Sequence, residues 1–199
     1  MTTTIEKTTN RSRTLQMVQI SMFSILMMIG ANISSFLIIG GVPITLQTFF
    51  ALLAGILLGS RTGAIAMLFY AFIGLVGLPV FAKFSGGIDS LISPTFGFIV
   101  SYIFVAYAVG EIVRKLPSVK GFVIAALVGT AINYLIGTNW MYAAYKFWFE
   151  APAGFTYKMA WAWMVVPLPK DIILAVFAGI FGYRLKPILF KSVKSNGWR

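Results

Sequence analysis

The chain alternates long apolar stretches with short polar segments, a pattern typical of a helical membrane protein. About 20 consecutive apolar residues cross a bilayer as an α-helix. By that measure the sequence predicts six membrane-spanning helices. They are expected at residues 15–39, 45–60, 62–78, 94–113, 121–138 and 160–183. The second and third are short, and they meet at a tight turn that contains Arg61 and Gly63.

Basic residues predict the orientation of these helices. Most of the 16 Lys and Arg residues lie in segments that this layout places on the side of the N-terminus, whereas Lys83, Lys146 and Lys158 lie on the other side. Cytoplasmic segments carry the excess of Lys and Arg in membrane proteins. We therefore expect both termini in the cytoplasm: a tail at 1–14, one transmembrane domain at 15–190 and a basic tail at 191–199.

Composition supports lipid as the main surrounding of the chain. Hydrophobic residues make up 59% of the sequence, charged residues only 11%, and the mean hydropathy is +0.88. A net charge of +11 raises the question of nucleic acid. However, the basic residues lie at the ends of apolar stretches, without a stripe or a binding motif. We expect membrane lipids as a partner and no nucleic acid.

Catalytic chemistry is not predicted for this chain. It has no Cys and no His, the residues that most often act as nucleophile, general base or metal ligand. The sequence also has no P-loop motif for binding ATP. We expect no enzyme activity, no cofactor and no metal site.

Lys170 and Asp171 are the strongest candidates for a functional site. Asp171 lies deep in the sixth predicted span, and an ionisable residue within a span is expensive and usually functional. Adjacent residues on a helix point about 100° apart, so we expect the two side chains to be poor mutual partners. Two separately directed charges favour a binding site. The alternative is an interfacial pair in which Lys170 extends toward water.

Several polar and aromatic residues are weaker candidates, each with a structural alternative. Thr45 and Gln47 point to one side if their segment is extended, but Thr45 is also a good helix cap. Asn133 suits either a cavity or a bond between helices. Thr95 lies at a helix start that can hold an anion or a carbonyl, or simply begins the helix. Trp163 suits an aromatic wall or an interfacial belt.

Six short blocks in the sequence carry a family resemblance. They are VPITLQT at 42–48, AGILLGSRTGA at 54–64, GLVGLPVFA at 74–82, GG at 86–87, SPTFGF at 93–98 and PLPKD at 167–171. In this order the sequence resembles the BioY family, the biotin-specific substrate-binding (S) components of energy-coupling factor (ECF) transporters.

The resemblance implies a six-helix S component that captures biotin outside the cell. Such a component docks with a transmembrane coupling subunit and two ATP-binding subunits. An S component for another vitamin, or a stand-alone facilitator, is the alternative. The positions that match the family's binding loops and sixth helix are Thr45, Gln47, Gly87, Thr95 and Asp171.

Biotin offers two ureido N–H groups, a ureido carbonyl, an apolar thioether ring and a carboxylate tail. We expect Asp171 to accept a hydrogen bond from a ureido N–H, and Asn133, Gln47 or Thr45 to donate to the carbonyl. Lys170 would pair with the carboxylate and Trp163 would cover the ring. The family usually has a Lys three residues after the Asp, where this chain has Leu174, so the basic residue has moved to position 170.

Overall fold

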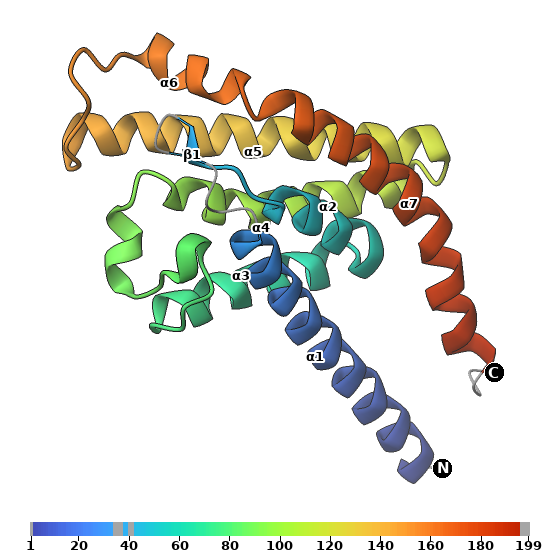
Figure 1. Cartoon of the computed structure of the whole chain (residues 1–199). Coiled ribbons are helices and arrows are strands. Elements are labelled where there is room, and N and C mark those ends of the chain that lie inside the picture. Colours follow the sequence, from blue (N-terminus) through green and yellow to red (C-terminus); the bar gives the residue numbers. More distant parts are fainter. Residues whose placement is uncertain (1, 34–37, 40–41, 196–199) are drawn as a thin grey trace.

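The computed structural model describes residues 2–33, 38–39 and 42–195, and it is almost entirely helical (Figure 1). The side chains of residues 13–33 and 43–188 are described with it. The helices are α1 (Thr2–Asn32), α2 (Gln47–Leu58), α3 (Ser60–Leu75), α4 (Phe96–Lys115), α5 (Val119–Phe147), α6 (Tyr157–Val165) and α7 (Leu168–Ser195). Two-residue strands, β1 (Ile38–Ile39) and β2 (Val42–Pro43), pair antiparallel before α2. Short 3-10 helices η1 (Ala82–Phe84) and η2 (Ile88–Ile92) join α3 to α4.

The helices include several that are long and apolar enough to cross a membrane. Within the described part of the chain these are residues 13–32, α4 and α5, and the bent pair α6–α7 raises the number from three to four. At 1.5 Å per residue, α2 and α3 extend only about 18 and 24 Å, less than the roughly 30 Å of a hydrocarbon core. The structure is thus that of a helical membrane protein, and these two short helices leave the predicted total of six unconfirmed.

Helix boundaries differ from the sequence predictions at several places. The first helix begins at Thr2, so residues 2–14 are helical, and it ends at Asn32 instead of residue 39. Helix α5 continues to Phe147, so much of the segment between the predicted fifth and sixth helices, residues 139–159, is helical. The segment between the predicted third and fourth helices, residues 79–93, contains the short helices η1 and η2. The ends of an apolar stretch indicate where the chain enters and leaves the lipid. A helix can extend beyond those ends, until a helix-breaking residue or an unfavourable contact stops it.

The sixth predicted span is broken. Helices α6 and α7 meet at an angle of 55° around Pro167. Proline lacks the N–H needed to continue the helical hydrogen bonds and its ring clashes with the preceding turn, which explains the bend. The break puts Lys170 and Asp171 in the first turn of α7 instead of the middle of a continuous helix.

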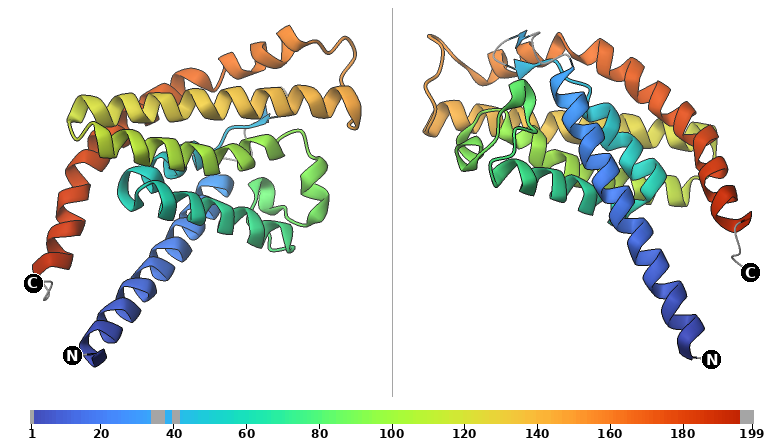
Figure 2. Two further views of the ribbon diagram at one scale, coloured as in Figure 1. Left: turned by 180° about the vertical axis from the view of Figure 1, so that it is seen from behind. Right: turned by 60° about the horizontal axis from the view of Figure 1, so that its bottom comes forward.

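Helix α4 lies at the centre of the packing, with α3 on one side, α5 on the other, and α2 against it. Helix α7 packs across α5 and α2, and α1 leaves the bundle at an angle (Figure 2). Gly110 permits a close approach of α4 to the start of α3, because a Cβ there would lie 2.2 Å from the backbone nitrogen of Ser60. The buried core includes Leu52, Met67 and Val105.

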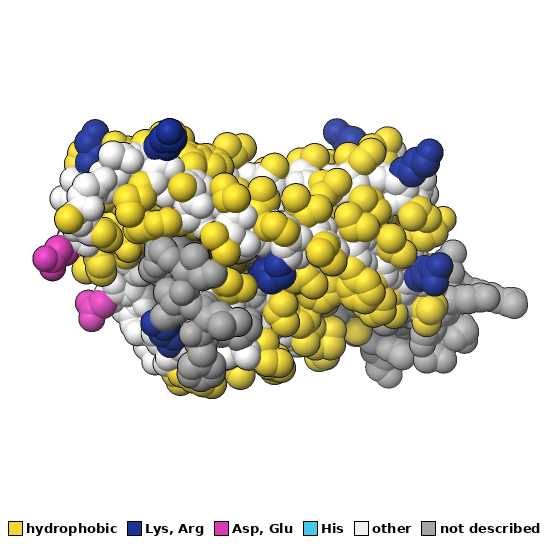
Figure 3. Space-filling model, turned by 45° about the horizontal axis from the view of Figure 1, so that its top comes forward, with side chains coloured by type: hydrophobic (Ala, Val, Ile, Leu, Met, Phe, Trp, Pro, Cys, Tyr) yellow, Lys and Arg dark blue, Asp and Glu magenta, His cyan; other side chains and the backbone are white. Residues whose placement is uncertain are grey.

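The outer surface is apolar. Large hydrophobic side chains such as Phe72, Phe104 and Ile173 are more than half exposed. In the space-filling view most basic side chains lie near the two ends of the molecule, with a largely hydrophobic surface between them (Figure 3). A surface of this kind suits contact with lipid hydrocarbon.

The loops divide between the two ends of the bundle. The start of α1, the end of α7, and the turns α2–α3 and α4–α5 lie toward one end (Figures 1 and 2). The β1–β2 hairpin, η1, η2 and the α5–α6 connection lie toward the other end. The second group surrounds the site described next.

Candidate ligand-binding site

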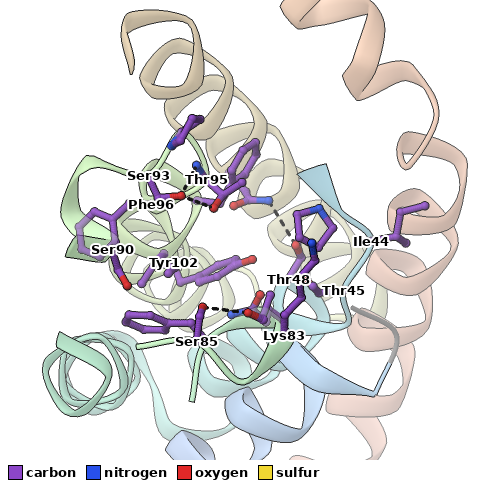
Figure 4. Close-up of a pocket in the computed structure, with 18 of the residues that line it drawn as sticks. Ile44, Thr45, Thr48, Lys83, Ser85, Ser90, Ser93, Thr95, Phe96 and Tyr102 are labelled. Atoms are coloured by element: carbon purple, nitrogen blue, oxygen red, sulfur yellow. Dashed lines mark hydrogen bonds between the residues drawn. The ribbon is translucent and has the colours of Figure 1, made fainter. Parts of the chain in front are cut away.

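A cavity of about 500 Å³ opens at the end of the bundle that holds η1 and η2. Its wall comes from the segment before α2 and the first turn of α2, from η1 and η2, from the start of α4, and from α5, α6 and α7. Figure 4 shows Lys83 and Ser85 on one side, Ser93 and Thr95 opposite them, and Tyr102 between. Small-molecule sites typically enclose about 300–1,000 Å³, so the cavity suits a vitamin-sized ligand.

A buried acid–base cluster forms one part of the wall. Asp171 is only 6% exposed, and Oδ2 of its carboxylate accepts a 2.7 Å hydrogen bond from the Tyr134 hydroxyl. Its other oxygen lies 2.8 Å from Nζ of Lys170, which also donates to the carbonyl of Thr45 at 2.6 Å. Helix α7 is thereby bonded to α5 and to the segment before α2.

The prediction that Lys170 and Asp171 would not be mutual partners is wrong. Their backbone directions diverge, but the long Lys170 side chain curves back to the carboxylate. A buried carboxylate needs such compensation because leaving it unpaired costs several kcal/mol. Lys170 therefore neutralises Asp171 in the protein itself.

Asn133 links three helices beside this cluster. It is 3% exposed, and its Nδ2 donates to Oγ1 of Thr48 at 3.2 Å. The Ser101 hydroxyl lies 2.6 Å from Oδ1 of Asn133 and also 2.6 Å from the carbonyl of Phe98. Both alternatives raised for Asn133 hold, since it lines the cavity and also bridges α2, α4 and α5.

Gln47 belongs to a second buried chain of hydrogen bonds. Its Nε2 donates at 2.8 Å to the hydroxyl of Tyr70, which in turn donates at 3.0 Å to the carbonyl of Val80. The chain connects the first residue of α2 to α3 and to the segment that leads into η1. It fixes the position of that segment against the cavity.

Trp140 of α5 and Trp148, the residue directly after α5, hold the segment before α4. The indole N–H of Trp140 donates to the carbonyl of Ser93 at 3.1 Å, and that of Trp148 donates to the carbonyl of Ile92 at 2.7 Å. Gly97 makes room for the first contact, because a Cβ there would lie 2.1 Å from Cβ of Trp140. The Thr95 hydroxyl lies 3.0 Å from that of Ser93 and makes no capping bond to α4.

Comparison with known proteins identifies the family. The BioY family model matches residues 2–191 of the 199. The chain belongs to the BioY family. A putative biotin transporter BioYB from Bacillus subtilis is 44% identical over 188 residues, covering 92% of this chain and 91% of that protein. A probable biotin transporter BioY from Lysinibacillus sphaericus is 34% identical, with the same coverage of both chains.

A solved structure shares the fold of this BioY-family chain. The crystal structure of the S-component for biotin from an ECF-type ABC transporter matches it with a TM-score of 0.76. The match covers 89% of this chain and 93% of that chain, at 22% sequence identity. At this identity the comparison demonstrates the S-component fold.

Most of the residues predicted from the sequence line the cavity of this BioY-family chain: Thr45, Gln47, Thr95, Asn133, Lys170 and Asp171. Gly87 does not, although Gly86 beside it does. The Gly87 N–H turns away and donates to the carbonyl of Gly74 at 2.7 Å.

Trp163 also lies outside the cavity lining, so the structure places it differently from the expected ring cover. Its ring is 5.2 Å from that of Phe155 and 6.2 Å from that of Tyr145, centroid to centroid. Helix α6 turns Trp163 into this aromatic cluster, which packs α6 against α5. Tyr145 lies between the cluster and the cavity, because it lines the latter.

Several lining residues were not predicted from the sequence: Thr48, Lys83, Ser93, Tyr102 and Tyr134. The tyrosines occur in apolar spans where nothing in the pattern separates an inward-facing ring from a lipid-facing one. The position of Lys83 depends on the backbone path of η1, which has no periodic signal. Thr48 and Ser93 had a usable signal, because they lie in the blocks that carry the family resemblance, one residue after Gln47 and two before Thr95.

Proposed function

We propose that this chain captures biotin on the extracytoplasmic side of the membrane and delivers it to an ATP-driven ECF importer. The observation that carries the proposal is a buried carboxylate, Asp171, in the wall of a vitamin-sized cavity in a BioY-family chain. The names of the relatives as biotin transporters, and of the solved S-component as one for biotin, support this substrate.

The chemistry of the cavity matches the two ring systems of biotin. Asp171 accepts from a ureido N–H through lone pairs that its bonds to Tyr134 and Lys170 leave available, since a carboxylate has about four acceptor sites. Aromatic side chains of the wall, Phe81, Phe96 and Phe98, surround the thioether ring.

Three residues are candidates to donate to the ureido carbonyl. Asn133 and Gln47 each donate one amide hydrogen within the protein, and an amide group carries two. The hydroxyl of Thr45 is the third candidate. All three lie on the cavity wall, on segments that the hydrogen bonds described above fix in place.

The proposed topology has six crossings with both termini in the cytoplasm. The start of α1 and the end of α7 lie toward the same end of the bundle, as an even number of crossings requires (Figure 1). The positive-inside bias then places the cavity on the extracytoplasmic side. The short helices α2 and α3 complete the count as two crossings, in a locally thinned bilayer or within the bundle.

ATP-driven delivery needs further subunits. The sequence contains no P-loop motif, so the proposed partners are a transmembrane coupling subunit and two ATP-binding subunits. In this proposal the present chain contributes substrate capture, and its partners contribute ATP hydrolysis.

Calorimetry on the purified, detergent-solubilised chain tests substrate capture. Biotin is titrated against the protein, with riboflavin and thiamine as controls. We expect saturable binding of biotin at least about 100-fold tighter than of either control, a difference of about 2.7 kcal/mol. Equal affinities for the three vitamins would refute the assignment of biotin.

Uptake in cells tests delivery. Labelled biotin is supplied to a biotin-auxotrophic host that expresses the chain with and without the ECF module. We expect sustained uptake only with the module and with intact ATP-binding subunits. Equal uptake without the module would identify a stand-alone facilitator.

A further inference from the structure

Lys83 holds an unusual backbone conformation on the cavity wall. Its φ is 60° and its ψ is 32°, and the φ of Phe84 is 53°. Both residues are in the left-handed region, which side chains other than Gly rarely adopt. Such conformations persist where the surrounding structure enforces them, and they cluster at functional sites.

The surrounding contacts do enforce this conformation. The Phe84 N–H donates at 2.7 Å to Oδ1 of Asn32, a buried residue at the end of α1. The Phe81 N–H donates to the carbonyl of Ser85 at 3.0 Å, and the Ser85 hydroxyl donates to the carbonyl of Ala82 at 2.9 Å. The segment 81–85 is thus a closed turn fixed to α1, with Lys83 at its tip.

The turn places Lys83 in the cavity wall. Figure 4 shows Lys83 beside Ser85, across the cavity from Ser93 and Thr95. Lys83 is exposed, whereas Asp171 is buried, so the two residues mark the open and the closed parts of the same cavity.

Four charged side chains line the cavity: Lys83, Asp89, Lys170 and Asp171. Lys170 and Asp171 neutralise each other, and Lys170 also bonds to the Thr45 carbonyl. Asp89 is exposed in the first turn of η2. Among the residues with described side chains, no ion pair within 4.0 Å joins Lys83 to Asp89 or to another acid. Of the two lysines in the cavity wall, Lys83 is therefore the one whose ammonium group pairs with no described carboxylate.

We propose that Lys83 binds the carboxylate of the ligand, in the role that the sequence analysis gave to Lys170. The inference rests on the proposed function, because it concerns a ligand with a carboxylate tail. Asp171 binds the ureido end in the buried part of the cavity, and the tail extends toward the opening. Lys170 instead acts on the ligand through Asp171, as a positioning residue.

The test compares biotin with biotinamide, which has the same rings but no charge on its tail. Calorimetry is run on the wild type, Lys83→Gln and Lys83→Gly. Glycine adopts the left-handed conformation without strain, so Lys83→Gly preserves the turn while it removes the charge. We expect both variants to bind biotin about fivefold more weakly, as for a largely exposed ion pair, and to bind biotinamide as the wild type does.

The matched control is Lys158→Gln, which removes an exposed lysine outside the cavity lining and should leave both affinities unchanged. Lys83→Arg should retain most of the affinity for biotin. An equal loss for both ligands in Lys83→Gly would show a structural role and overturn the proposal, as would unchanged biotin binding. Failure of the wild type to bind either ligand would instead refute the proposed function.

Asn32 gives an independent test through the geometry of the turn. Asn32→Ala removes the acceptor for the Phe84 N–H, so Lys83 loses its fixed position. We expect weaker binding of biotin and unchanged binding of biotinamide. In the Lys83→Gly background the same substitution should have no further effect on biotin affinity. Additive losses in the double variant would contradict the coupling of Asn32 to Lys83.

Discussion

The replacement Asp171→Asn removes the buried charge with little change of shape, and it tests the centre of the proposed site. The carboxylate accepts from the Tyr134 hydroxyl at 2.7 Å and pairs with Lys170 at 2.8 Å. An amide can still accept from Tyr134 through its oxygen. However, its nitrogen is a donor, and it meets either the Lys170 ammonium or a ureido N–H, both of which are also donors.

The expected loss follows from the kind of bond that is removed. A hydrogen bond to a charged group contributes about 1.5–3 kcal/mol, which corresponds to about 12- to 150-fold in affinity. The burial of Asp171 favours the upper part of this range, because water cannot replace the lost acceptor there. We therefore expect Asp171→Asn to bind biotin about 100-fold more weakly.

Calorimetry with biotin measures the loss, and Tyr134→Phe is the matched control. That variant removes one neutral donor and keeps the charge, so its loss should stay below about tenfold. Melting curves without ligand establish that both variants are folded. An Asp171→Asn affinity within threefold of wild type would show that the carboxylate does not contact biotin. A larger loss of biotin affinity in Tyr134→Phe than in Asp171→Asn would contradict the view that the charge contributes more than the tyrosine hydroxyl.

Three further substitutions have defined outcomes. Tyr70→Phe leaves the buried Gln47 amide without its partner, and it should lower the free energy of unfolding in detergent by about 1–3 kcal/mol; an unchanged melting curve would contradict this. Trp163→Phe should keep biotin affinity within about twofold, because the ring lies outside the cavity lining; a large loss by calorimetry would return it to the site. Gly137→Ala should lower stability by about 1–3 kcal/mol and also weaken biotin binding, because the added Cβ would lie 2.1 Å from the ring of Phe98, a lining residue; wild-type melting and affinity would refute the clash.

The sequence predicted the class of protein and part of the cavity wall, because both follow from apolarity and from the cost of burying polar groups. A carboxylate in an apolar segment is exceptional, which is why Asp171 was found directly. Asn133 was found as a polar residue within a span. Thr45 and Gln47 were found from the alternation of an extended segment, and the pattern left structural alternatives open for all three. Biotin as the ligand came from the family resemblance and not from these patterns.

Tertiary packing determined what the sequence did not predict. The contact between Lys170 and Asp171 depends on the curvature of one long side chain, which backbone periodicity does not describe. Tyr134 and Tyr102 face the cavity because of how their helices are rotated against their neighbours. Trp163 faces an aromatic cluster for the same reason. A hydrophobic pattern indicates which residues are buried, but it does not indicate which side chain each buried residue contacts.

Polar side chains of the cavity wall are already hydrogen-bonded to one another, and this affects which ligands the cavity selects. Asn133 bonds to Thr48 and Ser101, and Gln47 bonds to Tyr70, before any nutrient arrives. In the buried part of the cavity, a competing vitamin that is rich in hydroxyls or ring nitrogens would lose its hydration and find only the few sites that Asp171, Asn133 and Gln47 leave available. Such a wall rejects strongly hydrated molecules and favours a compact sulfur heterocycle with one small polar face.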